Sequence, residues 1–410
     1  MLGLAWLYRN ETELPEESSA RCKRVRMGIT IIQTSRLAAA VVVGAAIVTA
    51  GTYYPPSESA GGWRRCRSDE DVRNNAGMDP QRLDSIGREL SQIYKGPWQI
   101  VIIHRGHLVR EWFGVPAMPA TTFDAWSCTK SATGIAYGLL LDDSRNHKLP
   151  NNTQIDLDSP AYEFVPEGRP LSDARKEKIK LRHLLTMTSG IPGESQGLLG
   201  LAVAPGGGEY ELALGKQESR YGVSAAKLFA EPGKAWEYSD AAFAHLSLIF
   251  ARAAGREIAD YMKERVFGPV GIQNIGWDWQ GGAGNIGPHT NAHSGLRLSA
   301  RDFARLGYLM AHQGVWQGRQ IVPQWWIELA TRSSQDLNPD YGYTFWVNTN
   351  GRWPGVPKDA FAFSGFASNR CYIVPSLDLV VVRLGYDPPA WPEPALLAPV
   401  VHSITQVPQP

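Results

Sequence analysis

A serine and a lysine three residues apart are the first pair of side chains with chemical potential. Ser127 and Lys130 open the stretch 126–141, whose small and apolar residues are compatible with a helix. Residues i and i+3 share one face of a helix, and a helix start adds unpaired N–H groups near the hydroxyl. A hydroxyl beside a lysine is a nucleophile if burial lowers the lysine pKa enough for it to accept a proton.

The same spacing occurs again at Ser224 and Lys227. Pro232 and Gly233 follow closely, so the helix of this second copy would be short. It would offer no long apolar face to bury a lysine. We therefore interpret the second copy as unrelated to catalysis.

Tyr238 and Asp240 lie between a Pro-Gly turn and an apolar helix predicted at 241–254. A tyrosine in a loop before a helix can reach into a cleft. Asp240 is compatible with two roles, a helix cap or a residue of the site.

Ser364 and Gly365 end a strand predicted at 359–365, and Phe366 follows them. A glycine at this position allows substrate or backbone to approach closely. The next backbone N–H can then face an oxyanion.

Together these stretches resemble the serine beta-lactamase and penicillin-binding protein superfamily, in which a Ser-x-x-Lys motif carries the nucleophile. The stretches are similar to its class C-like branch, which includes class C beta-lactamases, D-aminopeptidase and carboxypeptidase types, family VIII esterases and 6-aminohexanoate-dimer hydrolases. The resemblance covers roughly 80–405 and also includes the stretches 181–190, 295–307 and 378–385.

The resemblance implies a mechanism without metal or other cofactor. Ser127 would attack a carbonyl and form an acyl-enzyme, with Lys130 as the general base, shared with Tyr238. Tyr238, its pKa lowered by Lys130, would pass the proton to the leaving group and activate the deacylating water. The backbone N–H groups of Ser127 and Phe366 would stabilise the oxyanion, with Ser364, Gly365 and Asp240 also lining the site.

Two positions depart from the family pattern. Asp240 stands where asparagine is usual, and its charge would hold Lys130 protonated or favour an amine-bearing substrate. Phe363 stands where penicillin-recognising members carry lysine or histidine. This counts against a beta-lactamase or D,D-peptidase and favours an esterase or an amidase of the nylon-oligomer type. Arg370 or Arg383 is an alternative source of positive charge.

Strand patterns occur at both ends of the domain, as a hairpin over 98–114 and as three strands at 359–365, 370–374 and 379–384. Helices are predicted between them, including a short one over 179–191 that Gly190 ends. This order of elements predicts an α+β fold. We expect an antiparallel sheet flanked by helices, as in the serine beta-lactamase and D,D-peptidase fold. A mostly helical subdomain at about 150–290 would be inserted into it. The serine helix would start where the two parts meet, and small-ligand sites favour such clefts.

The N-terminal part is expected to precede this domain as three segments. Residues 1–36 are polar, and 37–54 carry no charge over 18 residues, as in a membrane anchor or a signal peptide. Met27 is an alternative start, and a buried core helix is an alternative to the span. We interpret the segment 55–77 as a linker and the segment 78–405 as the hydrolase domain. Either export signal predicts a periplasmic or other extracytoplasmic location, with an inner-membrane anchor if the segment is retained.

The composition limits the function classes. A net charge of +1 over 410 residues argues against nucleic acid as a partner. The four cysteines show no C-x-x-C spacing, which argues against a structural zinc site. We predict a serine hydrolase for a small ester, amide or peptide. Alternatives are a catalytically silent penicillin-binding-like scaffold, and a D,D-peptidase or beta-lactamase that acts on cell-wall peptides or lactams.

Overall fold

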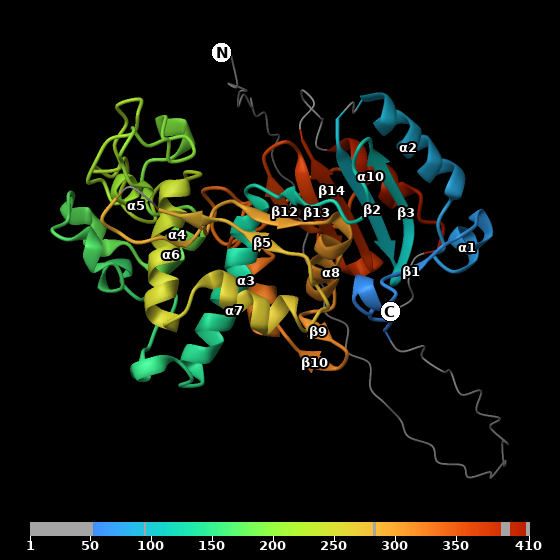
Figure 1. Ribbon diagram of the computed structural model, residues 1–410, viewed down its shortest axis with the longest axis horizontal. Coiled ribbons are helices and arrows are strands. Elements are labelled where there is room, and N and C mark those ends of the chain that lie inside the picture. Colours follow the sequence, from blue (N-terminus) through green and yellow to red (C-terminus); the bar gives the residue numbers. More distant parts are fainter. Residues whose placement is uncertain (1–51, 94–95, 282–283, 387–393, 407–410) are drawn as a thin grey trace, which may run out of the picture. The chain divides into compact units, whose positions relative to one another are not determined.

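A seven-stranded sheet is the centre of the folded domain (Figure 1). The computed structural model describes residues 52–93, 96–281, 284–386 and 394–406. The strand order is β1-β3-β2-β14-β13-β12-β11, and every pair except β1–β3 is antiparallel. The strands are β1 Arg64–Arg65, β2 Trp98–His104, β3 His107–Gly114, β11 Trp346–Val347, β12 Phe361–Gly365, β13 Asn369–Val374 and β14 Leu379–Gly385. The predicted hairpin and the three C-terminal strands are confirmed.

Alternation along the strands gives the sheet two apolar faces. Val380 and Val382 of β14 belong to a core shared with helices α3 (Cys128–Arg145) and α8 (Ala300–Ala311). Val381, between them, belongs to a second core shared with α2 (Pro80–Ile93) and α10 (Pro394–His402). Successive side chains of a strand point to opposite faces, so a sheet covered on both sides is apolar throughout. This is the α+β architecture that the sequence predicts.

Helices and long loops lie together beside the sheet, where the mostly helical subdomain was expected (Figure 1). They include α4 Leu181–Leu185, α5 Glu209–Ala213, α6 Asp240–Ala254 and α7 Ile258–Met262 with a π-helical turn at Lys263–Phe267; α9 spans Gln324–Ala330. Short strands pair as β4 (Phe123–Asp124), β8 (Leu296–Leu298) and β5 (Gly276–Trp277), as β6 (Trp279–Gln280) with β7 (His289–Thr290), and as β9 (Val315–Trp316) with β10 (Arg319–Gln320).

Helix α4 is shorter than the helix that the sequence predicts over 179–191. It ends at Leu185, and Met187 already has a positive φ of 61°. Gly190 has a φ of 78°, and a Cβ there would come within 2.2 Å of the carbonyl oxygen of Ala230. The last part of the predicted helix is therefore a tight loop packed against residue 230.

The segment 55–77 is not the linker that its composition indicates. It contains a 3-10 helix at Glu58–Ala60, strand β1 and helix α1 (Asp69–Asn74), and the side chains of Trp63 and Val72 are buried. The folded part thus begins well before Met78.

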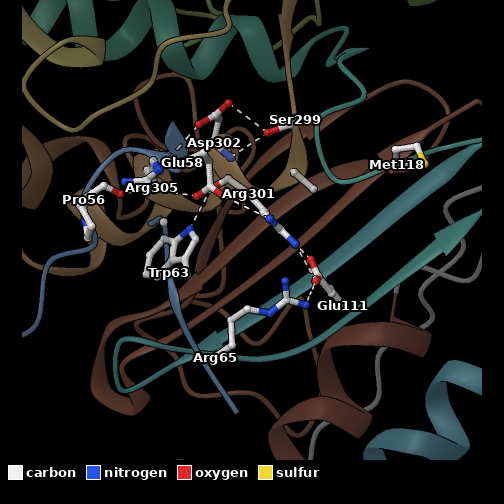
Figure 2. A network of polar contacts seen from close by, with 12 residues as sticks. Pro56, Glu58, Trp63, Arg65, Glu111, Met118, Ser299, Arg301, Asp302 and Arg305 are labelled. Carbon is white, nitrogen blue, oxygen red and sulfur yellow. Dashed lines mark hydrogen bonds and ion pairs between the residues drawn. The ribbon is translucent and has the colours of Figure 1, made fainter. Parts of the chain in front are cut away.

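Charged side chains fasten this segment to α8 and β3 (Figure 2). Arg305 donates to a carboxylate oxygen of Glu58 at 2.8 Å and to the carbonyl oxygen of Pro56 at 2.6 Å. Arg301 lies between Glu58, at 3.2 Å, and Glu111 of β3, at 2.7 Å. These arginines and glutamates therefore form one network of ion pairs.

The predicted membrane or signal segment falls mostly on residues 37–51, outside the described residues. In the described ranges no helix is both long enough and apolar enough to span a membrane. Tyr54, the last residue of the predicted segment, packs its ring against Tyr308 and Trp316.

Candidate active site

Helix α3 places Ser127 and Lys130 together, as their spacing predicts. Ser127 is the N-cap residue, and Lys130 lies on the first turn with only 2% of its surface exposed. Lys130 Nζ donates to Ser127 Oγ at 2.9 Å and to the carbonyl oxygen of His293 at 3.1 Å. The carbonyl of His293 therefore gives the amine a second hydrogen-bond acceptor.

The start of α6 brings Tyr238 and Asp240 to the same lysine. Lys130 Nζ is 2.6 Å from Oδ1 of Asp240 and 4.8 Å from the centroid of the Tyr238 ring. Ser239, not Asp240, is the N-cap residue, and its hydroxyl accepts a hydrogen bond from the N–H of Ala242. Asp240 therefore pairs with Lys130 and is not the cap of the helix.

The charge distribution around the tyrosine differs from the expected one. Burial and the Asp240 carboxylate raise the pKa of Tyr238 well above its usual value, and a hydrogen bond with Ser127 offsets this only in part. The expectation that Lys130 lowers the pKa of Tyr238 is therefore wrong. For Asp240, burial raises the pKa, but the charges of Lys130 and His293 outweigh it and the pKa is lowered overall.

The end of β12 packs directly against the start of α3. A Cβ on Gly365 would lie 2.3 Å from the carbonyl oxygen of Ala125 and 3.1 Å from the nitrogen of Cys128, so a side chain does not fit. The exposed ring of Phe366 stacks edge-to-face on Trp126, with centroids 5.4 Å apart. Within the described residues, the N–H groups of Ser127 and Phe366 donate to no protein acceptor. Both are therefore available at this junction.

The three residues discussed for substrate charge all make contacts within the domain. Phe363 is buried, with its ring centroid 5.1 Å from those of Phe303 and Phe345. Arg370 donates to the carbonyl oxygen of Gly365 at 2.6 Å, and the buried Arg383 donates to the carbonyl oxygen of Gly385 at 3.3 Å. Both arginines thus donate to backbone carbonyl groups at the end of the sheet.

Ser364 is half-buried and, by strand alternation, faces away from Phe363. Two further residues lie beside Lys130 and Tyr238 and were not predicted to do so; the sequence had indicated a structural or surface role for His293. One is His293, whose backbone binds Lys130. The other is Glu194, whose N–H donates to the carbonyl oxygen of Tyr238 at 2.9 Å. Both make these hydrogen bonds through the backbone, which no side-chain pattern in the sequence marks.

The second Ser-x-x-Lys copy lies outside this arrangement. Residues 224–227 form no helix, and Lys227 Nζ donates to the carbonyl oxygen of Ser172 at 3.1 Å. Among the described side chains, no group of three or more histidines, cysteines, aspartates or glutamates is placed to hold a metal ion.

Comparison with known proteins gives two curated relatives with named activities. The chain is 30% identical over 127 residues to the D-alanyl-D-alanine-carboxypeptidase/endopeptidase AmpH of Escherichia coli strain K12, covering 31% of each chain. It is 28% identical over 117 residues to the 6-aminohexanoate-dimer hydrolase of Paenarthrobacter ureafaciens, covering 25% of this chain and 27% of that one. The aligned segments therefore span about a third or less of these relatives.

Solved structures share the fold over a larger part of the chain. A penicillin-binding protein homologue from Caulobacter crescentus superposes with a TM-score of 0.58 at 17% identity, over 80% of this chain and 98% of that one. The sequence profile of the family described as Beta-lactamase matches residues 94–401, most of the chain and all of the site described above. The protein therefore belongs to the beta-lactamase family and is a serine-hydrolase-like member of it.

Proposed function

We propose that the protein hydrolyses an ester or amide bond through an acyl-enzyme intermediate on Ser127. The contact of 2.9 Å between Lys130 Nζ and Ser127 Oγ carries this proposal. It joins a nucleophile to a buried amine on one helix face, beside the phenol of Tyr238. Nucleophile and base within hydrogen-bond reach are the signature of covalent catalysis by a hydroxyl.

In the proposed acylation, Ser127 Oγ bonds to the substrate carbonyl carbon while its proton moves to the Lys130 and Tyr238 pair. The N–H groups of Ser127 and Phe366 bind the developing oxyanion. The same pair then returns the proton to the leaving alcohol or amine as its bond to the carbonyl carbon breaks. Water repeats the sequence on the acyl-enzyme and releases the acid. Loss of one oxyanion donor in comparable enzymes costs about 3 kcal/mol.

The surroundings favour a substrate without a carboxylate next to the scissile bond. Phe363 packs in the core, Arg370 binds backbone, and the charge nearest Lys130 is the negative one of Asp240. This supports esters or amides over penicillins. The relationship to AmpH supports a D-alanyl-D-alanine carboxypeptidase as the second candidate.

Hydrolysis of short p-nitrophenyl esters by the full-length protein tests the proposal. Ser127→Ala should lower the turnover by at least about 10³-fold, because no acyl-enzyme forms. Ser224→Ala is the matched control, since it removes the serine of the second Ser-x-x-Lys copy, and it should leave turnover unchanged.

The proposed hydrolase activity would be refuted if neither the wild type nor Ser127→Ala hydrolysed any of four substrates. These are p-nitrophenyl esters, a chromogenic cephalosporin, 6-aminohexanoate dimer and a D-alanyl-D-alanine peptide. A binding scaffold would then be the better account.

A further inference from the structure

Two exposed aromatic rings lie beside the nucleophile, where the start of α3 meets the end of β12. We infer that Trp126 and Phe366 form an aromatic ledge, which binds an apolar group of the substrate next to the scissile bond, an aryl group above all. The inference rests on the proposed function and deepens it, because it names the class of ester or amide that the site selects.

The two rings are open to solvent although they are large and apolar. Trp126 is 38% and Phe366 61% exposed, and the ring centroids lie 5.4 Å apart in an edge-to-face contact. Neither ring is among the residues of the two apolar cores described above. Single exposed apolar residues are common on proteins, but a stacked pair forms a continuous apolar surface. A ligand that covers this surface removes it from water, which favours binding.

The chain itself brings this surface to the reacting carbonyl group. Trp126 directly precedes Ser127, whose Oγ bonds to the carbonyl carbon in the proposed acylation. Phe366 supplies the second N–H of the proposed oxyanion site, about 3 Å from the carbonyl oxygen. Each ring is thus carried by a residue that binds the carbonyl group or adjoins the residue that does. An apolar group several bonds from the carbonyl carbon can reach the ledge, whereas a methyl group on that carbon is too short to cover it.

Hydrogen bonds hold the backbone of Trp126 in an unusual conformation. Its φ is 51°, in the left-handed region that a residue with a bulky side chain seldom adopts. Its N–H donates to Oδ1 of Asp124 at 2.7 Å. Its carbonyl oxygen accepts from the N–H of Thr129 at 2.9 Å and from the Thr129 hydroxyl at 2.6 Å. Residues strained in this way gather at functional sites, where the surrounding structure enforces them.

A buried asparagine holds Phe366 and links it to the turn at Trp126. The carbonyl oxygen of Phe366 accepts from the N–H of Asn369 at 3.2 Å and from its side-chain amide at 3.0 Å. The same amide donates to the carbonyl oxygen of Asp124 at 3.4 Å. The rings are therefore exposed but rest on a fixed backbone, so that little conformational entropy is lost when a ligand covers them.

Three esters test the ledge with the full-length protein in a pH-stat, which records the released acid. Ethyl acetate has no ring, ethyl 3-phenylpropanoate carries a phenyl ring on the acyl side, and 3-phenylpropyl acetate carries it on the alcohol side. The readout is the ratio of kcat/KM for a ring-bearing ester to kcat/KM for ethyl acetate. A general loss of activity cancels in this ratio.

Trp126→Asn removes one ring and introduces a residue that tolerates the left-handed region. Phe366→Ala removes the other ring and keeps the backbone N–H. Each variant should lower the ratio about tenfold for at least one ring-bearing ester, because a ring contact and its buried area are lost. The ester whose ratio falls shows which side of the scissile bond lies on the ledge. Ile93→Ala is the control, since it truncates an exposed apolar side chain on α2, which covers the opposite face of the sheet; it should leave all three rates unchanged.

Ratios that stay at the wild-type value for both ring-bearing esters, in either ledge variant, would overturn the inference. Calorimetric titration of the two ring-bearing esters into Ser127→Ala, with and without Trp126→Asn, measures the ledge without turnover. Binding should be weaker in the double variant. If this difference is found but the wild type hydrolyses no ester, only the proposed function fails. If the wild type turns over through Ser127 and neither the ratios nor the binding change, only the ledge fails.

Discussion

At the scale of single residues, the two Ser-x-x-Lys copies differ in burial, and only the buried copy brings its serine and lysine into contact. Lys130 lies inside the domain with a carboxylate, a hydroxyl and a carbonyl around it. Lys227 reaches a surface carbonyl from a segment without helix. The apolar residues after Ser127 predicted this difference, because they indicated a helix long enough to be buried. The places of His293 and Glu194 at the site were not predictable, since the hydrogen bonds that hold them there are made by backbone groups, which no side-chain pattern marks.

Tyr238→Phe removes the phenolic hydroxyl group and keeps the aromatic ring. The variant keeps the ring near Lys130, so substrate binding and melting temperature should change little. Without a hydroxyl to relay protons, kcat should fall by about 10²- to 10⁴-fold. Steady-state kinetics and thermal unfolding of the same preparation measure both effects. A kcat within a factor of about three of the wild type would exclude the phenol from the proton transfer.

At the scale of elements, the site depends on the junction between the start of α3 and the end of β12. The hairpin, the C-terminal strands and the helices after Ser127 and Tyr238 were all predictable, because alternation, capping residues and apolar runs are local signals. The sequence indicated that Gly365 permits close approach but not what approaches. The structure shows that it is the backbone of residues 125–128, a contact between segments more than 200 residues apart that no local signal encodes.

Gly365→Ala should therefore disturb the site more than the fold. Its Cβ would meet the carbonyl oxygen of Ala125 at 2.3 Å, so the strand end has to move away from Ser127. We expect a stability loss of about 1–3 kcal/mol, as for other overpacked positions. Displacement of the Phe366 N–H should lower kcat by about 10²-fold.

Gly287→Ala is the control for that experiment, because nothing lies within 4 Å of its Cβ position and its φ is not positive. It should match the wild type in denaturant unfolding and in kcat. If Gly365→Ala also matched the wild type in kcat, the end of β12 would not form part of the oxyanion site.

At the scale of the whole domain, the segment from Thr52 to β1 is part of the fold. Its sequence is rich in proline, glycine, serine and charge, which is typical of a linker. The prediction failed because the partners of those charges, Arg301 and Arg305, lie more than 240 residues away. Tyr54, at the end of the uncharged stretch 37–54, also packs on Tyr308 of α8.

Glu58→Gln tests whether this network stabilises the domain. The guanidinium of Arg305 is fully buried, and Glu58 supplies a carboxylate oxygen 2.8 Å from it. Removal of one partner leaves a buried charge less compensated, which we expect to lower the free energy of unfolding by about 2 kcal/mol. Denaturant unfolding of the full-length protein measures this loss. Glu89→Gln, on the exposed face of α2, should cost nothing measurable, and equal stability of the two variants would show that the network is not stabilising.

In the proposed function, Ser127 carries the acyl group during turnover. Intact-mass spectrometry after rapid acid quenching of a reaction with a p-nitrophenyl ester tests it most directly, with peptide mapping to locate the adduct. We expect the wild-type protein to be heavier by one acyl group, which maps to the peptide that contains Ser127. Ser127→Ala should carry no such adduct. Turnover that leaves Ser127 unmodified, or the same adduct in Ser127→Ala, would contradict it.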